Sequence, residues 1–181
     1  MDKNQLTRLS KFLSLHLRHQ PQDLGLTLAE GGWVQVEELL AGAARRGVSI
    51  SRAELEQVVT GNDKQRFAFD ETGTRIRAQQ GHSVEVDLQL PPASPPAVLF
   101  HGTVAAALPG IHQQGLQKMQ RHHVHLSAQE HTAQRVGQRR GQPILLAIDA
   151  AAMQQAGFVF YESGNGVWLT DQVPPQYLRQ L

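Results

Sequence analysis

Leucines near the start of the chain recur three or four residues apart, which is the spacing of one face of an α-helix. They are Leu6, Leu9, Leu13 and Leu17. The pattern predicts an amphipathic helix over residues 5–19, and Pro21 disfavours its continuation because proline pushes the preceding residue out of the helical region.

Two further helices are predicted before residue 62. A second helical face is formed by Val36, Leu39, Leu40 and Ala43. It lies between the Gly31–Gly32 turn and Gly47, which is a suitable residue just beyond a helix end. Ser51 and Glu54 have the spacing of a capping box for a third helix, which Gly61 ends.

The next apolar residues alternate with polar ones, as in a half-buried β-strand. Residues 67–69 and 75–77 predict the two strands of a hairpin, and the turn-forming residues 70–74 connect them. Three helices followed by a hairpin predict a winged-helix-like lobe for residues 1–90.

The rest of the chain has a different hydrophobic pattern, with short apolar segments typical of strands. They cover residues 98–100, 123–126, 144–148, 158–160 and 166–169. Helical patterns at 103–114 and 128–140 lie between some of these segments, which predicts an α+β lobe over residues 97–181. Four prolines within residues 91–96 predict a semi-rigid linker between the lobes.

The composition restricts the chemistry. None of the 181 residues is cysteine, which excludes disulfides, thiolate nucleophiles, cysteine-ligated zinc and iron–sulfur clusters. Seventeen Lys and Arg against sixteen Asp and Glu give a net charge of +1, so a polyanion must be bound by a local cluster of cations. The chain shows neither the apolar region of a signal peptide nor an apolar run of membrane-spanning length, which predicts a cytoplasmic protein without membrane segments.

Two cationic positions in the first ninety residues are candidates for binding an anion. Arg18 and His19 end the first predicted helix, where a positive side chain is also favourable for structural reasons, by about 0.3–1 kcal/mol. Arg66 precedes the strand residue Phe67 and, by alternation, faces the side opposite to it. Each position taken alone is explained as well by a solvated surface cation.

Histidines are concentrated in residues 121–127, which read Arg-His-His-Val-His-Leu-Ser. On a strand, His123 and His125 share one face, so the tract can present two imidazoles to one site. No carboxylate lies in the tract, and His131 is the nearest further ligand. Hydrogen bonding to a ligand is therefore favoured over a metal site.

The tripeptide His101-Gly102-Thr103 follows the apolar strand at residues 98–100. Glycine allows a backbone to approach a ligand closely, and Thr103 is a candidate cap for the next helix. The sequence contains neither G-x-x-x-x-G-K-[ST] nor G-x-G-x-x-G. Both a P-loop ATPase and a Rossmann dinucleotide site are therefore disfavoured.

The order and spacing of these segments resemble those of the RNA 2′-phosphotransferase family, often called tRNA 2′-phosphotransferases. The segments that carry the resemblance are Leu9–His19, Asp63–Phe67, Ile76–Ser83, Phe100–Thr103, His123–Ser127 and Asn165–Thr170. Because they extend over almost the whole chain, chance similarity is a poor explanation.

The resemblance implies an N-terminal winged-helix-like lobe and a C-terminal ADP-ribosyltransferase-like lobe that binds NAD+ without a Rossmann motif. The implied reaction moves an internal 2′-phosphate of RNA, of the tRNA splice-junction type, onto NAD+. Its products are nicotinamide, RNA with a 2′-hydroxyl and ADP-ribose 1″,2″-cyclic phosphate, formed through an ADP-ribosylated RNA 2′-phosphate.

The resemblance also implies roles for individual residues. The catalytic set falls on Arg18, His19, Arg66 and Arg121. Arginine suits a phosphate dianion because its planar guanidinium stays charged. Lys64 is implied to be a further phosphate contact. NAD+ is expected against His101, Gly102, Thr103, His125 and Ser127, and no metal is expected.

One segment departs from many protein ADP-ribosyltransferases, which carry a late glutamate that engages the nicotinamide ribose or the acceptor. The comparable strand here is Gly166-Val167-Trp168, which has no acid. A carboxylate at this place would repel an incoming phosphate.

Two alternatives stay open. The same NAD+ fold is compatible with ADP-ribosylation of another nucleic-acid phosphate or base, or of a protein. The second alternative is a DNA-binding winged helix joined to a nucleotide sensor, although the third predicted helix carries Arg52 against Glu54 and Glu56 and is not a basic recognition helix. A monomer is expected, and the natural RNA is open.

Overall fold

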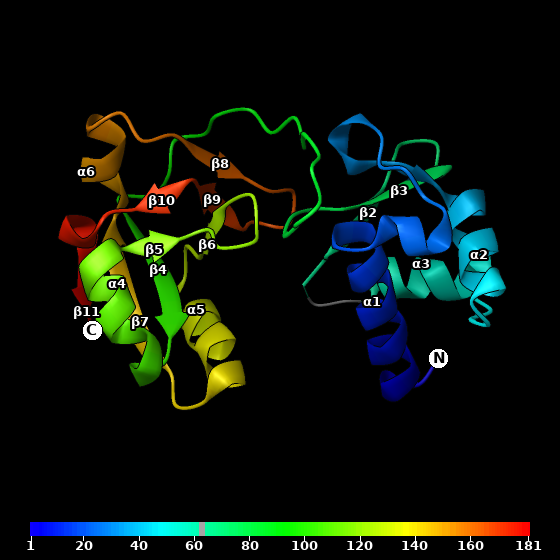
Figure 1. The fold of residues 1–181 in the computed structure, drawn as a ribbon, viewed down its shortest axis with the longest axis horizontal. Coiled ribbons are helices and arrows are strands. Elements are labelled where there is room, and N and C mark those ends of the chain that lie inside the picture. The colour runs from blue at the N-terminus through cyan, green and yellow to red at the C-terminus, as the bar shows by residue number, and fades with distance from the viewer. Residues whose placement is uncertain (62–63) are drawn as a thin grey trace. The chain divides into compact units, whose positions relative to one another are not determined.

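The computed structural model describes residues 1–61 and 64–181. Asp63, which begins one of the resembling segments, lies outside the described residues. The chain divides into two compact units, Met1–Gln89 and Leu90–Leu181 (Figure 1). Both contain helices and small antiparallel sheets, so the predicted α+β class is confirmed.

The first unit contains three helices and a three-stranded antiparallel sheet. The helices are α1 (Lys3–Arg18), α2 (Val36–Arg45) and α3 (Arg52–Thr60), and short 3-10 turns occupy Pro21–Leu24 and Glu30–Gly32. The strands β1 (Val34–Gln35), β2 (Phe67–Phe69) and β3 (Arg75–Ala78) pair in the order β1-β3-β2. The predicted helices and hairpin are confirmed, whereas β1 is too short for alternation to indicate it.

The starts of two of these helices are set by their caps. The Asp2 carboxylate accepts a hydrogen bond from the Gln5 amide at 2.7 Å at the start of α1. In α3 the predicted capping box is present, with Ser51 and Glu54 each bonding the other's backbone amide. Such a cap contributes about 1 kcal/mol, so both helices begin at defined residues.

The core of the first unit contains the leucine face of α1 and inward-facing residues of the sheet. Its fully buried side chains include Leu13, Leu17, Leu39, Leu55, Phe67 and Ile76. Each such side chain contributes about 1.5–3 kcal/mol relative to exposure. This packing holds the last turn of α1, where Arg18 lies, against the rest of the unit.

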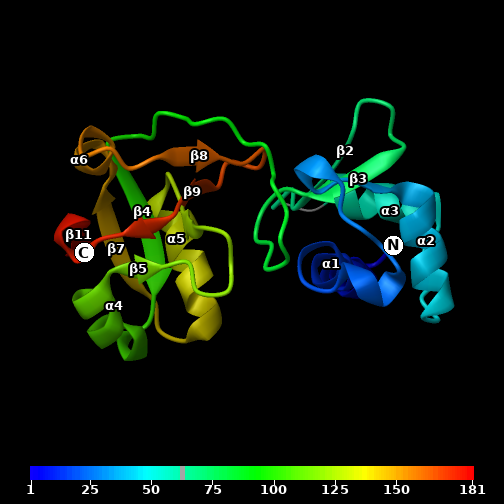
Figure 2. The same cartoon turned by 45° about the horizontal axis from the view of Figure 1, so that its top comes forward.

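The second unit contains eight strands in three small antiparallel sheets, with helices packed against them (Figure 2). The strands are β4 (Val98–Thr103), β5 (Leu116–Gln117), β6 (Val124–Leu126), β7 (Ile144–Asp149), β8 (Phe160–Glu162), β9 (Trp168–Thr170), β10 (Gln172–Val173) and β11 (Leu178–Gln180). They pair in the orders β11-β7-β4, β6-β9-β8 and β10-β5. The helices are α4 (Leu108–Gln114), α5 (Glu130–Gly137) and α6 (Ala150–Gln155).

Several element boundaries in this unit differ from the sequence prediction. Strand β4 runs to Thr103 and α4 starts at Leu108 with Ala107 as its N-cap, so the predicted helix 103–114 begins too early. The prediction that Thr103 caps this helix is therefore wrong. Strand β8 begins at Phe160 rather than at 158 because the chain first turns at Gly157, which has a φ of 93°.

The proline-rich residues 91–96, predicted as a linker, belong to the second unit. The Ala93 amide donates a hydrogen bond to the Phe160 carbonyl at 2.8 Å, and Pro92 forms a bridge with Tyr161. Proline has no amide hydrogen and is therefore tolerated at the edge of a sheet. The segment lies along β8, which is an edge strand.

Candidate active site

Two of the predicted catalytic residues end helix α1. Arg18 is its last residue, and His19 is the C-cap, whose amide donates to the Leu15 carbonyl. The Nε and Nη2 atoms of Arg18 are buried, and its Cζ lies 5.9 Å from the centroid of the buried Phe67 ring. A cation over a ring face gains about 0.5–2 kcal/mol. The Arg18 side chain is therefore held between α1 and the start of β2.

The chain after β3 covers the end of α1. The Ser83 amide donates to the Arg18 carbonyl at 2.9 Å, and the Ser83 hydroxyl lies 2.8 Å from Nδ1 of His19. Gly81 packs against the Arg18 side chain, with a left-handed φ of 89° that favours glycine. The last residues of the resembling segment Ile76–Ser83 thus position both Arg18 and His19.

Arg66 enters β2 from a turn with unusual backbone geometry. Gln65 has a φ of 40°, which is uncommon for a residue with a side chain, and it separates the exposed Lys64 from Arg66. Such a conformation costs about 1–3 kcal/mol and is concentrated at functional sites. Burial lowers the pKa of Arg66, although a guanidinium group stays charged in proteins.

The first unit brings Arg18, His19 and Arg66 to the same end of the β2–β3 hairpin. The Arg66 carbonyl accepts a hydrogen bond from the Gln79 amide at 2.9 Å, just beyond the end of β3. Two residues later comes Gly81, where an added Cβ would lie 3.6 Å from Nη1 of Arg18. Three of the four predicted catalytic residues are therefore gathered within this unit.

In the second unit, Arg121 and His125 contact each other. Nη1 of Arg121 lies 3.0 Å from Nδ1 of His125. Because a guanidinium can only donate, Nδ1 of His125 accepts, and Nε2 carries the proton. Desolvation, followed by the charge of Arg140, lowers the pKa of Arg121. None of the ion pairs in the described part of the chain gives Arg121 a carboxylate partner, so this exposed cation is available to an anionic ligand.

His101 lies on β4 and is bonded to the backbone of β6. Its Nδ1 donates to the His125 carbonyl at 3.1 Å, which leaves Nε2 as an acceptor. Burial is the main cause of the lowered pKa of His101, the hydrogen bond to His125 opposes it, and the positive charges of Arg140 and Arg121 add to it. His101 is therefore uncharged at neutral pH and suits a hydroxyl group better than an anion.

The remaining predicted cofactor residues lie where β4 meets β6. Ser127 and Phe100 exchange backbone hydrogen bonds of 2.9 and 2.8 Å, which holds the carboxyl end of β6 against β4. Thr103 is buried at the end of β4. A Cβ on Gly102 would lie 1.8 Å from the carbonyl oxygen of Ala133 in α5. The packing of α5 on β4 therefore requires glycine at this position, and the contact of Gly102 with NAD+ stays a prediction.

Comparison with known proteins identifies the family. The protein-family model that matches residues 4–172 is described as "RNA 2'-phosphotransferase, Tpt1 / KptA family". A relative from Trichormus variabilis, named "Probable RNA 2'-phosphotransferase", is 58% identical over 181 residues, which is 100% of both chains. A relative of the same name from Streptomyces griseus is 57% identical over 98% of both chains. Another, from Rhodopirellula baltica, is also 57% identical, over 96% of this chain and 95% of its own. The chain belongs to the RNA 2′-phosphotransferase family.

In this RNA 2′-phosphotransferase family member, a further cation, Arg140, lies near His101 and Arg121 and is not indicated by the sequence. Arg139-Arg140 fits the cationic end of the helix pattern 128–140 and carries no other signal. The charge of Arg140 lowers the pKa of both His101 and Arg121, so Arg140 lies near each of them. Nothing in the sequence spacing of these three residues predicts this proximity.

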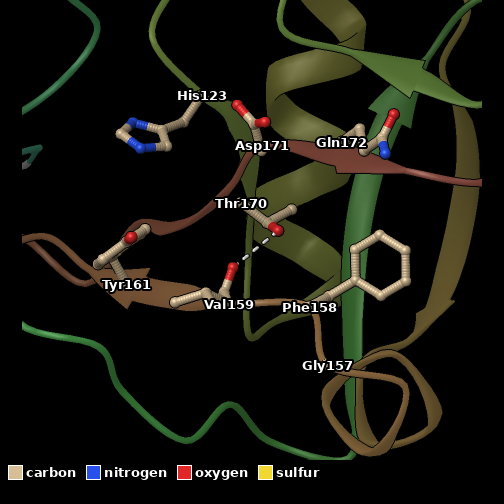
Figure 3. A pocket seen from close by; sticks show the side chains of 8 residues that line it. All are labelled: His123, Gly157, Phe158, Val159, Tyr161, Thr170, Asp171 and Gln172. Atoms are coloured by element: carbon tan, nitrogen blue, oxygen red, sulfur yellow. Dashed lines mark hydrogen bonds between the residues drawn. The ribbon is translucent and has the colours of Figure 1, made fainter.

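A pocket of about 350 Å³ lies beside the start of β6 (Figure 3). His123 and Tyr161 form one wall, with their ring centroids 5.4 Å apart. Phe158 lines the pocket from another side, and Asp171 and Gln172 supply polar groups. His123 is one of the two imidazoles expected on this face of the tract, whereas its neighbour Tyr161 is not indicated by the sequence.

Groups of metal ligands and membrane-spanning helices are both absent from residues 1–61 and 64–181. Within these ranges, no three His, Cys, Asp or Glu side chains are grouped as metal ligands. Over the same described residues, no helix has the length and apolar character needed to cross a membrane.

Proposed function

We propose that the protein transfers an internal 2′-phosphate of RNA to NAD+, releasing nicotinamide and giving 2′-hydroxyl RNA and ADP-ribose 1″,2″-cyclic phosphate through an ADP-ribosylated RNA 2′-phosphate. In this proposal the first unit is a winged-helix-like lobe that binds the RNA, and the second is an ADP-ribosyltransferase-like lobe that binds NAD+. A tRNA with a phosphorylated splice junction is the proposed type of substrate. Family membership and the chemistry of the named side chains support the proposal.

The observation that carries the proposal is the arrangement of Arg121. Its guanidinium is oriented by a hydrogen bond to His125, and no carboxylate among the described residues neutralises it. A positioned arginine of this kind binds a phosphate oxygen with a charge-assisted hydrogen bond.

Arg18 and Arg66 supply further positive charge in the proposed reaction. Both are partly buried, so each loses less side-chain freedom on binding than a fully solvated arginine would. In the first step a phosphate oxygen displaces nicotinamide from C1″, and in the second the ribose O2″ displaces the RNA 2′-oxygen from phosphorus. The arginines orient the phosphate in the first step and stabilise charge on phosphorus in the second.

His19 is the proposed general acid of the second step. When O2″ loses its proton and bonds to phosphorus, the departing RNA 2′-oxygen must gain one. The hydrogen bond between Ser83 and Nδ1 orients the His19 ring, and Nε2 is the proposed proton donor. Transfer of a proton in this way contributes about 10²- to 10⁴-fold to a rate.

The residues of the second unit fit the co-substrate. NAD+ supplies an electrophilic ribose carbon with nicotinamide as its leaving group. The uncharged His101 offers Nε2 to a ribose hydroxyl, and Ser127 lies beside Phe100 on the neighbouring strand. Arg140, close to His101 and Arg121, is placed to bind an oxygen of a diphosphate. The residues named here thus offer a neutral partner for a ribose hydroxyl and a positive charge for a diphosphate, and none of them is acidic.

The test uses an RNA oligonucleotide with one internal 2′-phosphate, with and without NAD+, in the presence of EDTA. RNA dephosphorylation and nicotinamide release are followed together. Because a hydrogen bond to a charged group contributes about 1.5–3 kcal/mol, Arg121→Gln is expected to lower kcat/KM about 10- to 150-fold. Arg179→Gln, an exposed change on β11, is the matched control and is expected to leave it unchanged.

Two results would contradict the proposal. NAD+-independent loss of the phosphate would indicate a phosphatase. Nicotinamide release with the phosphate retained under an ADP-ribose adduct would indicate a transferase that only ADP-ribosylates nucleic acid.

A further inference from the structure

The pocket beside β6 has the mixed walls that suit a nucleobase. Its volume of about 350 Å³ is near the lower end for small-molecule sites, which leaves room for one base and part of its ribose rather than for a dinucleotide. His123 and Tyr161 line it on one side and Phe158 on another, and Asp171 and Gln172 add polar groups (Figure 3). A purely apolar ligand would leave the polar wall without partners, and a purely ionic one would leave the rings unused.

The aromatic wall presents uncharged rings. The ring centroids of His123 and Tyr161 are 5.4 Å apart, the ring planes are inclined at 58°, and both residues are partly buried. Burial is the main cause of the lowered pKa of His123, so this imidazole is neutral at neutral pH. Nucleobases stack on such rings with little dependence on their sequence.

The polar wall presents hydrogen-bonding groups that are held in place or free to adapt. Nζ of Lys118 lies 2.6 Å from a carboxylate oxygen of Asp171, which orients the carboxylate and offsets its charge against a nearby phosphodiester. Asp171 accepts hydrogen bonds from exocyclic amines, and the Gln172 amide both donates and accepts. The Thr170 hydroxyl already donates to the Val159 carbonyl at 2.9 Å, so it shapes the wall instead.

Tyr161 of the pocket lies on the same face of the sheet as His125, which contacts Arg121. His125, Leu169 and Tyr161 are direct cross-strand neighbours on β6, β9 and β8. With adjacent strands about 4.8 Å apart, the backbones of His125 and Tyr161 are about 10 Å apart. A phosphate bound by Arg121 and a base stacked on Tyr161 therefore fit within one nucleotide.

The order of groups along β6 matches the order of groups in the reaction. Ser127, at the carboxyl end, adjoins β4 and the proposed NAD+ residues. His125, in the middle, carries the Arg121 contact, and His123, at the amino end, faces the pocket. Co-substrate, phosphate and base would then follow one another along the strand.

We propose that this pocket binds the nucleobase of the RNA nucleotide whose 2′-oxygen carries the phosphate. The inference rests on the proposed function, because it assigns the base of that same substrate. It also assigns Tyr161 as the main stacking surface and Asp171 as the acceptor for an exocyclic amine of adenine, cytosine or guanine.

The experiment compares two RNA oligonucleotides with the same internal 2′-phosphate. One carries adenine at the phosphorylated nucleotide, and the other is abasic there. The ratio of their kcat/KM values for the wild-type enzyme is expected to be about tenfold in favour of adenine. Tyr161→Ala is expected to bring the ratio close to one, whereas the matched variant Tyr161→Phe, which keeps a stacking ring, is expected to preserve it.

A second variant, Asp171→Asn, tests the inference even if Tyr161→Ala does not fold. The Asp171 side chain is 75% exposed, so Asp171→Asn is expected to keep the thermal stability of the wild type and to reduce the preference for adenine severalfold. The inference would be overturned if Tyr161→Ala lowered kcat/KM equally for both oligonucleotides and Asp171→Asn left the ratio of the two kcat/KM values undiminished. A raised KM for NAD+ alone would assign the pocket to a base of the co-substrate and would overturn it too.

The same oligonucleotides distinguish this inference from the proposed function. If the wild-type enzyme does not dephosphorylate either RNA, the proposed function fails. Fluorescence anisotropy of the labelled oligonucleotides then still measures binding. Tighter binding of the adenine oligonucleotide that Tyr161→Ala abolishes supports the pocket, and equal binding of both oligonucleotides to the wild type refutes it.

Discussion

Replacing Gly102 with alanine tests whether α5 packs directly on the strand that carries His101. The added Cβ would meet the Ala133 carbonyl oxygen at 1.8 Å, the Ala133 carbonyl carbon at 2.7 Å and the Gly137 amide nitrogen at 2.9 Å. All three are backbone atoms, so no side-chain rotation relieves the overlap. Helix α5 must move by about 1.5 Å before ordinary contact is restored.

The expected cost is at the upper end of the range for overpacking, about 3 kcal/mol. For a unit of this size, each kcal/mol lowers the melting temperature by about 4–8 °C. Gly102→Ala should therefore lower the melting temperature of the second unit by about 12–24 °C. The same movement displaces His101 and Thr103, so NAD+-dependent turnover should fall with it.

Differential scanning calorimetry measures this shift, and Gly110→Ala is the matched control. Gly110 lies in α4, and a Cβ there meets no heavy atom within 4 Å. Alanine is the better helix former by about 1 kcal/mol, so the control should raise the transition slightly or leave it unchanged. A melting temperature of Gly102→Ala within about 2 °C of the wild type would refute the packing of α5 on β4.

Three further predictions concern the site. His19→Ala is expected to lower single-turnover rates about 10²- to 10⁴-fold, whereas Ser83→Ala, which removes only an orienting hydrogen bond, should lower them about fivefold; equal losses would contradict the separate roles. The pKa of His101 in the folded chain is below its ordinary value of about 6.5. As the pH falls below about 6.5, His101 therefore binds a proton in the unfolded chain before it does so in the folded chain, and the free energy of unfolding decreases. Denaturant titrations should show a shallower decrease for His101→Gln, and an unchanged slope would argue against a neutral His101. Val167→Glu should reduce kcat/KM for the phosphorylated RNA about tenfold through repulsion, and Val167→Gln should reduce it less; full activity of the glutamate variant would remove the electrostatic argument.

The elements that could be predicted from the sequence are those with local causes. The leucine face of α1 and the capping box of α3 involve residues three or four positions apart, so their pattern is visible without a fold. Strands such as β1, β5 and β11 have only two or three residues. Their existence depends on distant partners, for example β11 on β7, and no local alternation indicates them.

The candidate site shows the same division. The residue types that suit a phosphate are visible in the sequence, and the resemblance selects among them. Their orientation is not visible, because Ser83 reaches His19 across 64 positions and His101 reaches His125 across 24. The packing of α5 on Gly102 is not visible either, because only the tertiary structure brings the backbone of Ala133 and Gly137 next to this glycine.

The proposed transfer of phosphate from RNA to NAD+ can be followed through the phosphorus atom itself. An RNA labelled with ³²P at one internal 2′-phosphate is incubated with the protein and NAD+, and the labelled products are separated. We expect the label to pass through an ADP-ribosylated RNA and to end in ADP-ribose 1″,2″-cyclic phosphate, in an amount equal to the nicotinamide released. Label recovered as inorganic phosphate, or left on the RNA while nicotinamide is released, would contradict it.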